Sequence, residues 1–322
     1  MERKKKVLIS RRFVGNAAAR IRDLYEVREW PHDEPMPKAT LREWIADCDG
    51  YFGVGDPLDE EVLREAVRLK VISTVAAGTD NIDLQYCTQN GIAVGHTPGA
   101  VTAATADMTM ALLLAALRGL IPLAEKVRSG RWLMNAPALD LGRDPAGKTL
   151  GIVGMGQIGL AVARRAEAFG MNVVYYSRKT MIPSYRRCDS LRELAEHSDV
   201  VSLHVPLTDE TYHLIDRHAL RWFKRDAWLI NMSRGPVVDL TALTDALQNG
   251  QLAGAALDVT EPEPIPADHP VLRLPNVLVT PHAGSATRET REAMANLALE
   301  NLLRGLNGQK LKHCANPQVY DR

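Results

Sequence analysis

The sequence has little cysteine and no excess of either charge. Its four cysteines are scattered over 322 residues and form no Cys-x-x-Cys pair, which argues against a disulfide framework or a zinc site and fits a reducing cytoplasm. Lysine and arginine together number 39 and are balanced by 39 aspartates and glutamates. The basic excess typical of nucleic-acid-binding proteins is therefore missing. We expect neither a metal nor a nucleic-acid partner.

Long hydrophobic runs are also missing. The best candidate, residues 108–117, is shorter than a membrane span and is typical of a buried helix. The basic residues 1–6 are followed by only a short apolar run, so the start of the sequence predicts no signal peptide. These absences favour a cytoplasmic protein without a membrane partner.

The sequence does contain a regular alternation of short β-branched runs and helical patterns. In the first third it predicts strands at residues 6–10, 25–29, 51–54, 71–75 and 92–95, and helices at 16–23, 38–47, 59–69 and 81–89. Such alternation indicates a parallel sheet covered on both faces. A long helix rich in alanine, leucine and methionine follows at 101–120. A bridge between domains, a subunit contact and simple core packing would all give this pattern.

A second alternating series begins near residue 148. It predicts strands at 149–153, 172–177, 200–205, 228–232, 253–259 and 277–280, and helices at 158–169, 190–196, 217–223 and 239–248. The last helix, at 289–306, follows the completed series and is expected to return to the first domain. The predicted fold is therefore α/β, with two doubly wound parallel-sheet domains. A Rossmann cofactor domain at 100–287 is inserted in a flavodoxin-like substrate domain formed by 1–99 and 288–322, and a ligand is expected in the cleft between them.

A Gly-x-Gly-x-x-Gly pattern lies directly after an apolar run and before a helical pattern. In such a loop Gly154 allows a tight turn, Gly156 lets the backbone approach phosphates, and Gly159 lets the helix pack closely on the strand. The free N–H groups at the helix start suit an anionic pyrophosphate. Glycines also occur in ordinary turns, but this position between strand and helix predicts a dinucleotide site that includes Gln157 and Ile158.

The end of the next strand indicates which dinucleotide binds. An NAD site usually has Asp or Glu there, about 20 residues after the fingerprint, to bind the ribose 2′-hydroxyl. This sequence has Ser177, followed by Arg178 and Lys179. These residues can bind a 2′-phosphate by charge-assisted hydrogen bonds, although a solvated basic loop would give the same pattern. We predict NADP, with NAD as a weaker alternative.

Three polar residues follow late strands of the second series. Arg234, Glu263 and His282 lie in separate loops, and ligands of open α/β sheets bind beyond the carboxyl ends of strands. An arginine fork suits a carboxylate, and a histidine held by a carboxylate can give a proton to a developing alkoxide. Each residue alone could be an ordinary surface group. All three behind a cofactor fingerprint are not expected by coincidence and indicate one shared site.

These motifs resemble those of a known family. The segments 154–159, 231–235, 257–264 and 281–287 are similar to the D-isomer-specific 2-hydroxyacid dehydrogenases, and most similar to their glyoxylate/hydroxypyruvate reductase branch. The resemblance extends from about residue 54 to residue 311. It implies an NADPH-preferring reductase of small 2-oxo acids such as glyoxylate and hydroxypyruvate. It also implies a homodimer built by the helix around Met108.

The resemblance also implies roles for individual residues. Arg234 would bind the substrate carboxylate, and His282 would be the acid/base, with Glu263 as its partner. The backbone N–H groups of Ala77 and Gly78 would hold the carboxylate. Cofactor contacts are implied at Thr105, Val205, Pro206, Met232, Asp258 and Gly284, with Asp258 at the nicotinamide amide.

The loop around residues 132–137 leaves the preferred substrate undecided. Animal members of the reductase branch have an aromatic residue there that reaches the partner's active site, and the aligned residue here is Asn135, with Trp132 as a possible substitute. A dehydrogenase for D-lactate or phosphoglycerate therefore remains an alternative. A dinucleotide-sensing corepressor with this fold is a second one.

Overall fold

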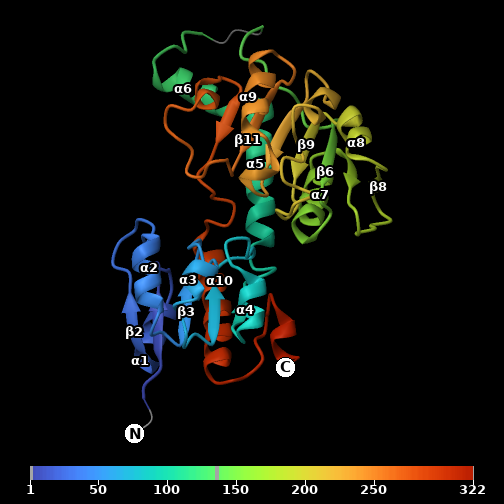
Figure 1. The fold of residues 1–322 in the computed structure, drawn as a ribbon. Coiled ribbons are helices and arrows are strands. Elements are labelled where there is room, and N and C mark those ends of the chain that lie inside the picture. Colours follow the sequence, from blue (N-terminus) through green and yellow to red (C-terminus); the bar gives the residue numbers. More distant parts are fainter. Residues whose placement is uncertain (1–2, 135–137, 322) are drawn as a thin grey trace. The chain divides into compact units, whose positions relative to one another are not determined.

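The structure, a computed structural model, describes residues 3–134 and 138–321 (Figure 1). The chain forms two compact units. Unit 1 contains Met1–Val101 and Ala286–Arg322, and unit 2 contains Thr102–Ser285. Each unit has one sheet, and the strands pair in parallel throughout both. The predicted α/β fold with two parallel sheets is confirmed.

The sheet of unit 1 has five strands in the order β2-β1-β3-β4-β5, which is the flavodoxin-like order. The strands are β1 (Lys6–Ile9), β2 (Glu26–Glu29), β3 (Gly50–Gly53), β4 (Val71–Thr74) and β5 (Ala93–Gly95). The helices are α1 (Ala17–Leu24), α2 (Lys38–Ile45), α3 (Glu60–Leu63), α4 (Leu84–Gln89) and α10 (Arg288–Leu306), with a 3₁₀ turn η4 (Pro317–Tyr320).

Helix α10 comes from the end of the chain and completes the core of unit 1. It packs against β3, β4 and β5. A Cβ atom on Gly50 would lie 2.9 Å from Leu302, so the missing side chain lets the helix approach the strand. The buried Ser73 hydroxyl donates to the Ala298 carbonyl at 2.7 Å. The C-terminal segment is thus an integral part of this unit.

The sheet of unit 2 has seven strands in the order β12-β11-β10-β9-β6-β7-β8. They are β6 (Thr149–Val153), β7 (Asn172–Tyr176), β8 (Arg186–Arg187), β9 (Val200–Leu203), β10 (Trp228–Asn231), β11 (Gly254–Leu257) and β12 (Val277–Val279). The helices are α5 (Thr102–Arg118), α6 (Leu120–Arg128), α7 (Gln157–Ala168), α8 (Leu191–His197) and α9 (Leu240–Gln248), with 3₁₀ turns η1 (Ala219–Trp222), η2 (Gly235–Val237) and η3 (Pro270–Arg273). From β6 to β8 successive strands are added on one side of β6, and from β9 onward they are added on its other side. Open α/β sheets bind ligands where the strand order changes side in this way, which here is between β6 and β9.

Four local predictions were wrong. Helix α6 was not predicted, and β8 adds a seventh strand where six were expected, because two exposed arginines give no strand pattern. The helix expected at 59–69 ends at Leu63, because the chain continues in turns with i→i−3 bonds instead of helical i→i−4 bonds. The helix expected at 217–223 is the 3₁₀ turn η1, whose tighter winding, with fewer residues per turn, comes from i→i−3 bonds of the same kind.

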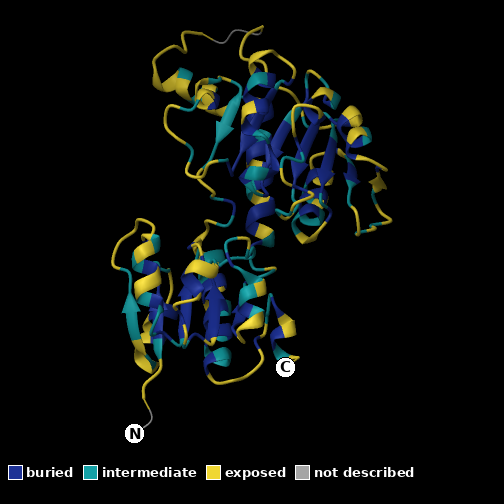
Figure 2. Ribbon diagram, in the orientation of Figure 1, coloured by how far each residue is buried: buried dark blue, intermediate teal, exposed yellow. Residues whose placement is uncertain are grey.

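Burial follows the layers of each unit. In both sheets the central strands are buried, and the outer faces of the helices are exposed (Figure 2). Helix α5 buries nine of its 17 residues, whereas α6 buries none. Within the described residues, no single helix has the length and hydropathy to span a membrane. The pair α5 and α6, bent by 64°, meets those criteria by length and composition only.

Candidate functional site

The glycine fingerprint forms the turn between β6 and α7. Gly154 has φ +96°, which strongly favours glycine, and its N–H donates to the Tyr176 carbonyl at 2.9 Å. A Cβ atom on Gly159 would lie 2.2 Å from the Gly154 carbonyl oxygen. The first and third glycines are therefore required by the turn and by the close packing of α7 on β6.

The second glycine faces open space. A Cβ atom on Gly156, the N-cap residue of α7, would meet nothing within 4 Å. The N-terminal N–H groups of this 12-residue helix can bind an anion. A pyrophosphate of a dinucleotide fits these features, because it needs close backbone approach and helix N–H donors at the same place. Gln157 is exposed beside this turn, and Ile158 packs against the core of the unit.

The loop after β7 carries the residues predicted to select the cofactor. The Ser177 hydroxyl accepts from the Thr180 N–H at 3.2 Å, and Arg178 and Lys179 are exposed. Arg178 Nη1 lies 3.8 Å from Glu210 Oε2. The Thr208 hydroxyl bond, a backbone N–H and the charges of Arg178 and Lys179 together lower the pKa of Glu210. A carboxylate thus lies beside the predicted phosphate-binding cation.

Arg187 is a residue of this loop that sequence reasoning missed. Its Nε and Nη2 both donate to the Ser177 carbonyl, at 3.2 and 2.9 Å. Arg187 lies in the edge strand β8, which pairs with β7. The basic pair in the sequence was the available signal, but its position beside Ser177 depends on the pairing of the two strands.

Arg234 lies between β10 and η2. The buried Asn231 side chain donates to the Arg234 carbonyl at 3.0 Å, and its Oδ1 accepts from the N–H and hydroxyl of Ser233. A Cβ atom on Gly235 would lie 1.8 Å from the Thr260 carbonyl, so this loop packs tightly against the segment after β11. Asn231, which sequence reasoning did not single out, holds the backbone that presents Arg234.

Glu263 and His282 are in direct contact. His282 Nδ1 lies 2.6 Å from Glu263 Oε1, and both side chains are about half-exposed. His282 has φ +50°, an unusual value for a residue with a side chain. Its N–H bonds to the Asp258 and Thr280 carbonyls. A strained, well-bonded histidine at a loop is typical of a functional position.

Opposing influences act on the carboxyl group of Glu263. Partial burial is the largest of them and raises its pKa. The hydrogen bond and charge of His282, a backbone bond at Thr260 and the charge of Arg234 act in the other direction, and the net effect lowers the pKa of Glu263. The carboxylate form therefore persists at neutral pH, as an acceptor for His282 Nδ1–H. Arg234 lies close enough to contribute to this balance.

Asp258 organises the loop that carries His282. Its carboxylate is 2% exposed. One oxygen accepts from the Thr280 hydroxyl at 2.6 Å and the Ala283 N–H at 2.8 Å, and the other accepts from the Gly284 N–H at 2.7 Å. A Cβ atom on Gly284 would lie within 3.5 Å of Asp258, Met232 and Thr105. These four predicted cofactor contacts thus gather at one place in unit 2.

The loop after β9 lies beside the fingerprint turn. A Cβ atom on Gly154 would lie 2.6 Å from the His204 carbonyl and 2.9 Å from Val205. The Pro206 carbonyl accepts from the Thr211 hydroxyl at 2.7 Å. His204 Nε2 lies 2.8 Å from the Ser202 hydroxyl, while its buried Nδ1 has no partner in the described part of the chain. Burial lowers the pKa of His204 to about 3. This ring is therefore neutral at physiological pH.

The predicted substrate loop belongs to unit 1 and follows β4. Ala77 and Gly78 are half-buried. The Ala76 carbonyl accepts from the Thr97 N–H at 2.8 Å, and His96 Nδ1 lies 2.9 Å from the Ala77 carbonyl. No hydrogen bond from the N–H of Ala77 or Gly78 occurs within residues 3–134 and 138–321. Both groups can therefore donate to a ligand.

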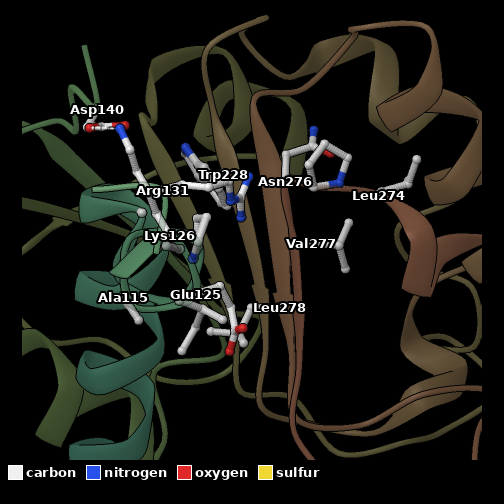
Figure 3. A pocket seen from close by; sticks show the side chains of 15 residues that line it. Ala115, Glu125, Lys126, Arg131, Asp140, Trp228, Leu274, Asn276, Val277 and Leu278 are labelled. Atoms are coloured by element: carbon white, nitrogen blue, oxygen red, sulfur yellow. Dashed lines mark hydrogen bonds and ion pairs between the residues drawn. The ribbon is translucent and has the colours of Figure 1, made fainter. Parts of the chain in front are cut away.

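A cavity of about 510 Å³ lies in unit 2, and none of the predicted site residues is among those that line it (Figure 3). Ala115, Trp228, Val277 and Leu278 form part of its apolar wall, and Lys126, Arg131 and Asp140 are at its polar side. Trp132, the residue after the lining residue Arg131, is 64% exposed. Asn135 lies outside the described residues.

Comparison with known proteins places these features in a family. The model of the D-isomer specific 2-hydroxyacid dehydrogenase NAD binding domain matches residues 110–284. The glyoxylate reductase of Korarchaeum cryptofilum is 44% identical over 328 residues, which cover 98% of this chain and 97% of the relative. The glyoxylate/hydroxypyruvate reductase B of Serratia proteamaculans is 44% identical over 294 residues, which cover 89% and 88%.

Solved structures agree with this comparison. A protein of Thermus thermophilus has a TM-score of 0.91 at 46% identity, and the match covers 96% of this chain and 99% of that one. The NADPH-dependent glyoxylate/hydroxypyruvate reductase of Sinorhizobium meliloti, in complex with NADP and malonate, has a TM-score of 0.87 at 30% identity. That match covers 98% of both chains.

Proposed function

Because the chain belongs to the D-isomer specific 2-hydroxyacid dehydrogenase family, we propose that it is an NADPH-preferring reductase of small 2-oxo acids, with glyoxylate and hydroxypyruvate as the first candidates. As a member of this family it is an NAD(P)-dependent enzyme. The observation that carries the proposal is the 2.6 Å hydrogen bond between His282 Nδ1 and Glu263 Oε1. It orients the ring and leaves Nε2 for proton transfer.

Each residue of the proposed site has a distinct task. NADPH, when bound, supplies the hydride for the carbonyl carbon of the substrate. His282 gives the proton to the carbonyl oxygen, and Glu263 holds the ring in the orientation that this transfer needs. Arg234 binds the substrate carboxylate, and the N–H groups of Ala77 and Gly78 bind it as well. Fixing the carboxylate in this way aligns the carbonyl for reaction.

The preference for NADPH rests on the loop after β7. Ser177 stands where NAD-binding proteins usually have a carboxylate, and Arg178 and Lys179 are exposed and available to a 2′-phosphate. The Arg187 contacts hold the Ser177 carbonyl in place. The related enzyme of Sinorhizobium meliloti is described as NADPH-dependent. Glu210 beside Arg178 is expected to weaken this preference without reversing it.

We also propose a homodimer. Helix α6 buries none of its residues, and Leu120, Ile121 and Val127 on it are 56%, 48% and 55% exposed. Such an apolar patch is typical of a protein–protein interface, and the cavity of Figure 3 lies directly beside it. Light scattering after gel filtration should give twice the chain mass of 35.5 kDa. A monomer at micromolar concentration would contradict the proposal.

A panel of 2-oxo acids tests the proposed reaction. Glyoxylate, hydroxypyruvate, pyruvate and phosphohydroxypyruvate should each be assayed with NADPH and with NADH. We expect the highest kcat/KM for glyoxylate or hydroxypyruvate with NADPH. Higher values for pyruvate or the phosphorylated acid would assign a different substrate. Absence of turnover with every pair would remove the proposed function.

A further inference from the structure

The conformation of the substrate loop depends on the segment that follows β5. His96 and Thr97 form hydrogen bonds with two consecutive carbonyl groups of the loop, those of Ala77 and Ala76. The Thr97 contact uses a backbone N–H, whereas the His96 contact uses a side chain. Only the second contact therefore depends on the residue type at its position.

Because the peptide unit is planar, these hydrogen bonds to carbonyl groups also determine where the neighbouring N–H groups point. The Ala77 carbonyl and the Gly78 N–H belong to the same peptide unit and point in opposite directions when the bond is trans. A bond that fixes the carbonyl therefore also fixes the direction of the Gly78 N–H. In the same way, the Thr97 bond to the Ala76 carbonyl fixes the Ala77 N–H. The two donors of the proposed carboxylate site are thus directed away from residues 96 and 97.

His96 is itself anchored to the core of unit 1. Its N–H donates to the His313 carbonyl at 3.2 Å, and its carbonyl accepts from the Asn301 side chain at 3.1 Å. Asn301 is fully buried on α10, and its Oδ1 accepts from the His313 N–H at 3.1 Å. Gly95 lacks a Cβ atom that would lie 2.7 Å from Asn301. The backbone at His96 is therefore held independently of its imidazole.

The chemistry of the contact identifies the donor. A carbonyl oxygen can only accept, so His96 Nδ1 carries the hydrogen. An asparagine amide at this position could donate in the same direction, but a phenylalanine ring could not. The two replacements therefore separate the hydrogen bond from the volume of the ring.

We propose that His96 is a positioning residue that aims the Gly78 N–H at the substrate carboxylate through its Nδ1–H bond to the Ala77 carbonyl. This inference rests on the proposed function, because it assigns the loop to carboxylate binding. The Thr97 bond is unchanged when the imidazole is lost, so the loop stays attached and only the Gly78 peptide gains freedom. The carboxylate is held equally before and during the reaction. Loss of the His96 hydrogen bond should therefore raise KM and leave kcat nearly unchanged.

Kinetics of three variants test the proposal. His96→Phe should raise KM for glyoxylate by about five- to tenfold, the range expected for one hydrogen bond. Its kcat, its Kd for NADPH and its Tm should stay close to the wild-type values. His96→Asn should restore KM to within about twofold of wild type. His313→Phe is the matched control, since His313 is also half-buried in unit 1 and its ring forms no hydrogen bond with the loop within residues 3–134 and 138–321.

A binding measurement gives the same comparison without turnover. Calorimetry with oxalate, a planar carboxylate probe, on the NADP⁺-saturated protein should show about five- to tenfold weaker binding to His96→Phe and near-normal binding to His96→Asn. Three results would overturn this inference but leave the proposed function intact. They are a wild-type affinity and KM in His96→Phe, failure of His96→Asn to restore both values, and an equal effect of His313→Phe. A wild-type protein that neither turns over 2-oxo acids nor binds oxalate would overturn the proposed function, and this inference with it.

Discussion

At the scale of single residues, the proposed chemistry depends on contacts between side chains that are distant in sequence. Glu263 and His282 are 19 residues apart, and their 2.6 Å contact is made by two loops after neighbouring strands. The sequence predicted both loops, and the family resemblance predicted the pair. The sequence did not predict the positive φ of His282. Nor did it predict the three hydrogen bonds that the Asp258 carboxylate accepts from Thr280, Ala283 and Gly284, because these arise only when β11 and β12 lie side by side.

Replacing His282 and Glu263 one at a time should distinguish the proton transfer by His282 from the orientation of its ring by Glu263. His282→Ala should lower kcat by about 10²- to 10⁴-fold, the usual contribution of a general acid, with little change in NADPH binding. Glu263→Gln should lower kcat less, by about tenfold, because the ring stays but loses its charged acceptor. Steady-state rates and fluorescence titration of NADPH measure both effects. Near-normal turnover of His282→Ala would mean that another group is the acid.

The cations after β7 should determine the choice of cofactor. Arg178→Ala should raise KM for NADPH by about tenfold or more and leave KM for NADH nearly unchanged, because only NADPH carries the 2′-phosphate. Glu210→Gln should have the opposite effect and lower KM for NADPH by about twofold, since exposed charge pairs contribute little. Equal changes with both cofactors would remove these residues from phosphate recognition.

His204 should make stability depend on pH. Its pKa in the folded protein is about 3, well below its ordinary value of 6.5. Between these values the unfolded chain binds a proton that the folded protein excludes, so the free energy of unfolding falls as pH falls from 6.5 towards 3. The slope from this group is at most about 1.4 kcal/mol per pH unit. His204→Gln, which cannot be protonated, should show a shallower decline in urea unfolding between pH 6 and 4. Parallel profiles would contradict this account.

At the scale of elements, the turn between β6 and α7 shows what a sequence pattern can predict. The glycine spacing predicted the strand, the turn and the helix, because Gly154 and Gly159 each answer a local steric demand. The same reasoning missed α6 and β8. Their sequences carry weak patterns, and β8 exists only through its pairing with β7. Local patterns therefore predicted the central elements better than the edge of the sheet.

Two alanine substitutions in this turn should have different consequences. A Cβ atom on Gly159 would lie 2.2 Å from the Gly154 carbonyl, so Gly159→Ala should lower the free energy of unfolding by about 1–3 kcal/mol. A Cβ atom on Gly156 meets nothing within 4 Å. Gly156→Ala should therefore unfold like wild type but bind NADPH about tenfold more weakly, because the methyl group takes the place proposed for the pyrophosphate. Calorimetry and thermal unfolding check both. Wild-type NADPH affinity in Gly156→Ala would argue against the proposed pyrophosphate position.

At the scale of the whole molecule, alternation of strands and helices predicted two parallel sheets, and the structure has them in the flavodoxin-like and Rossmann orders. The roles of the two units follow from their loops. Unit 2 carries the fingerprint turn and the His282–Glu263 pair, and unit 1 carries the loop of Ala77 and Gly78. We propose that unit 2 binds the cofactor and that unit 1 contributes carboxylate-binding N–H groups.

The measurement that tests this account most directly is the initial rate of NADPH oxidation by the wild-type protein with glyoxylate, compared with the rate with NADH. We predict turnover with both cofactors and a kcat/KM for glyoxylate that is at least about tenfold higher with NADPH, the equivalent of one charge-assisted contact to the 2′-phosphate. A preference for NADH would contradict the assignment of Ser177, Arg178 and Lys179. No oxidation of either cofactor, with glyoxylate or with hydroxypyruvate, would contradict the central claim.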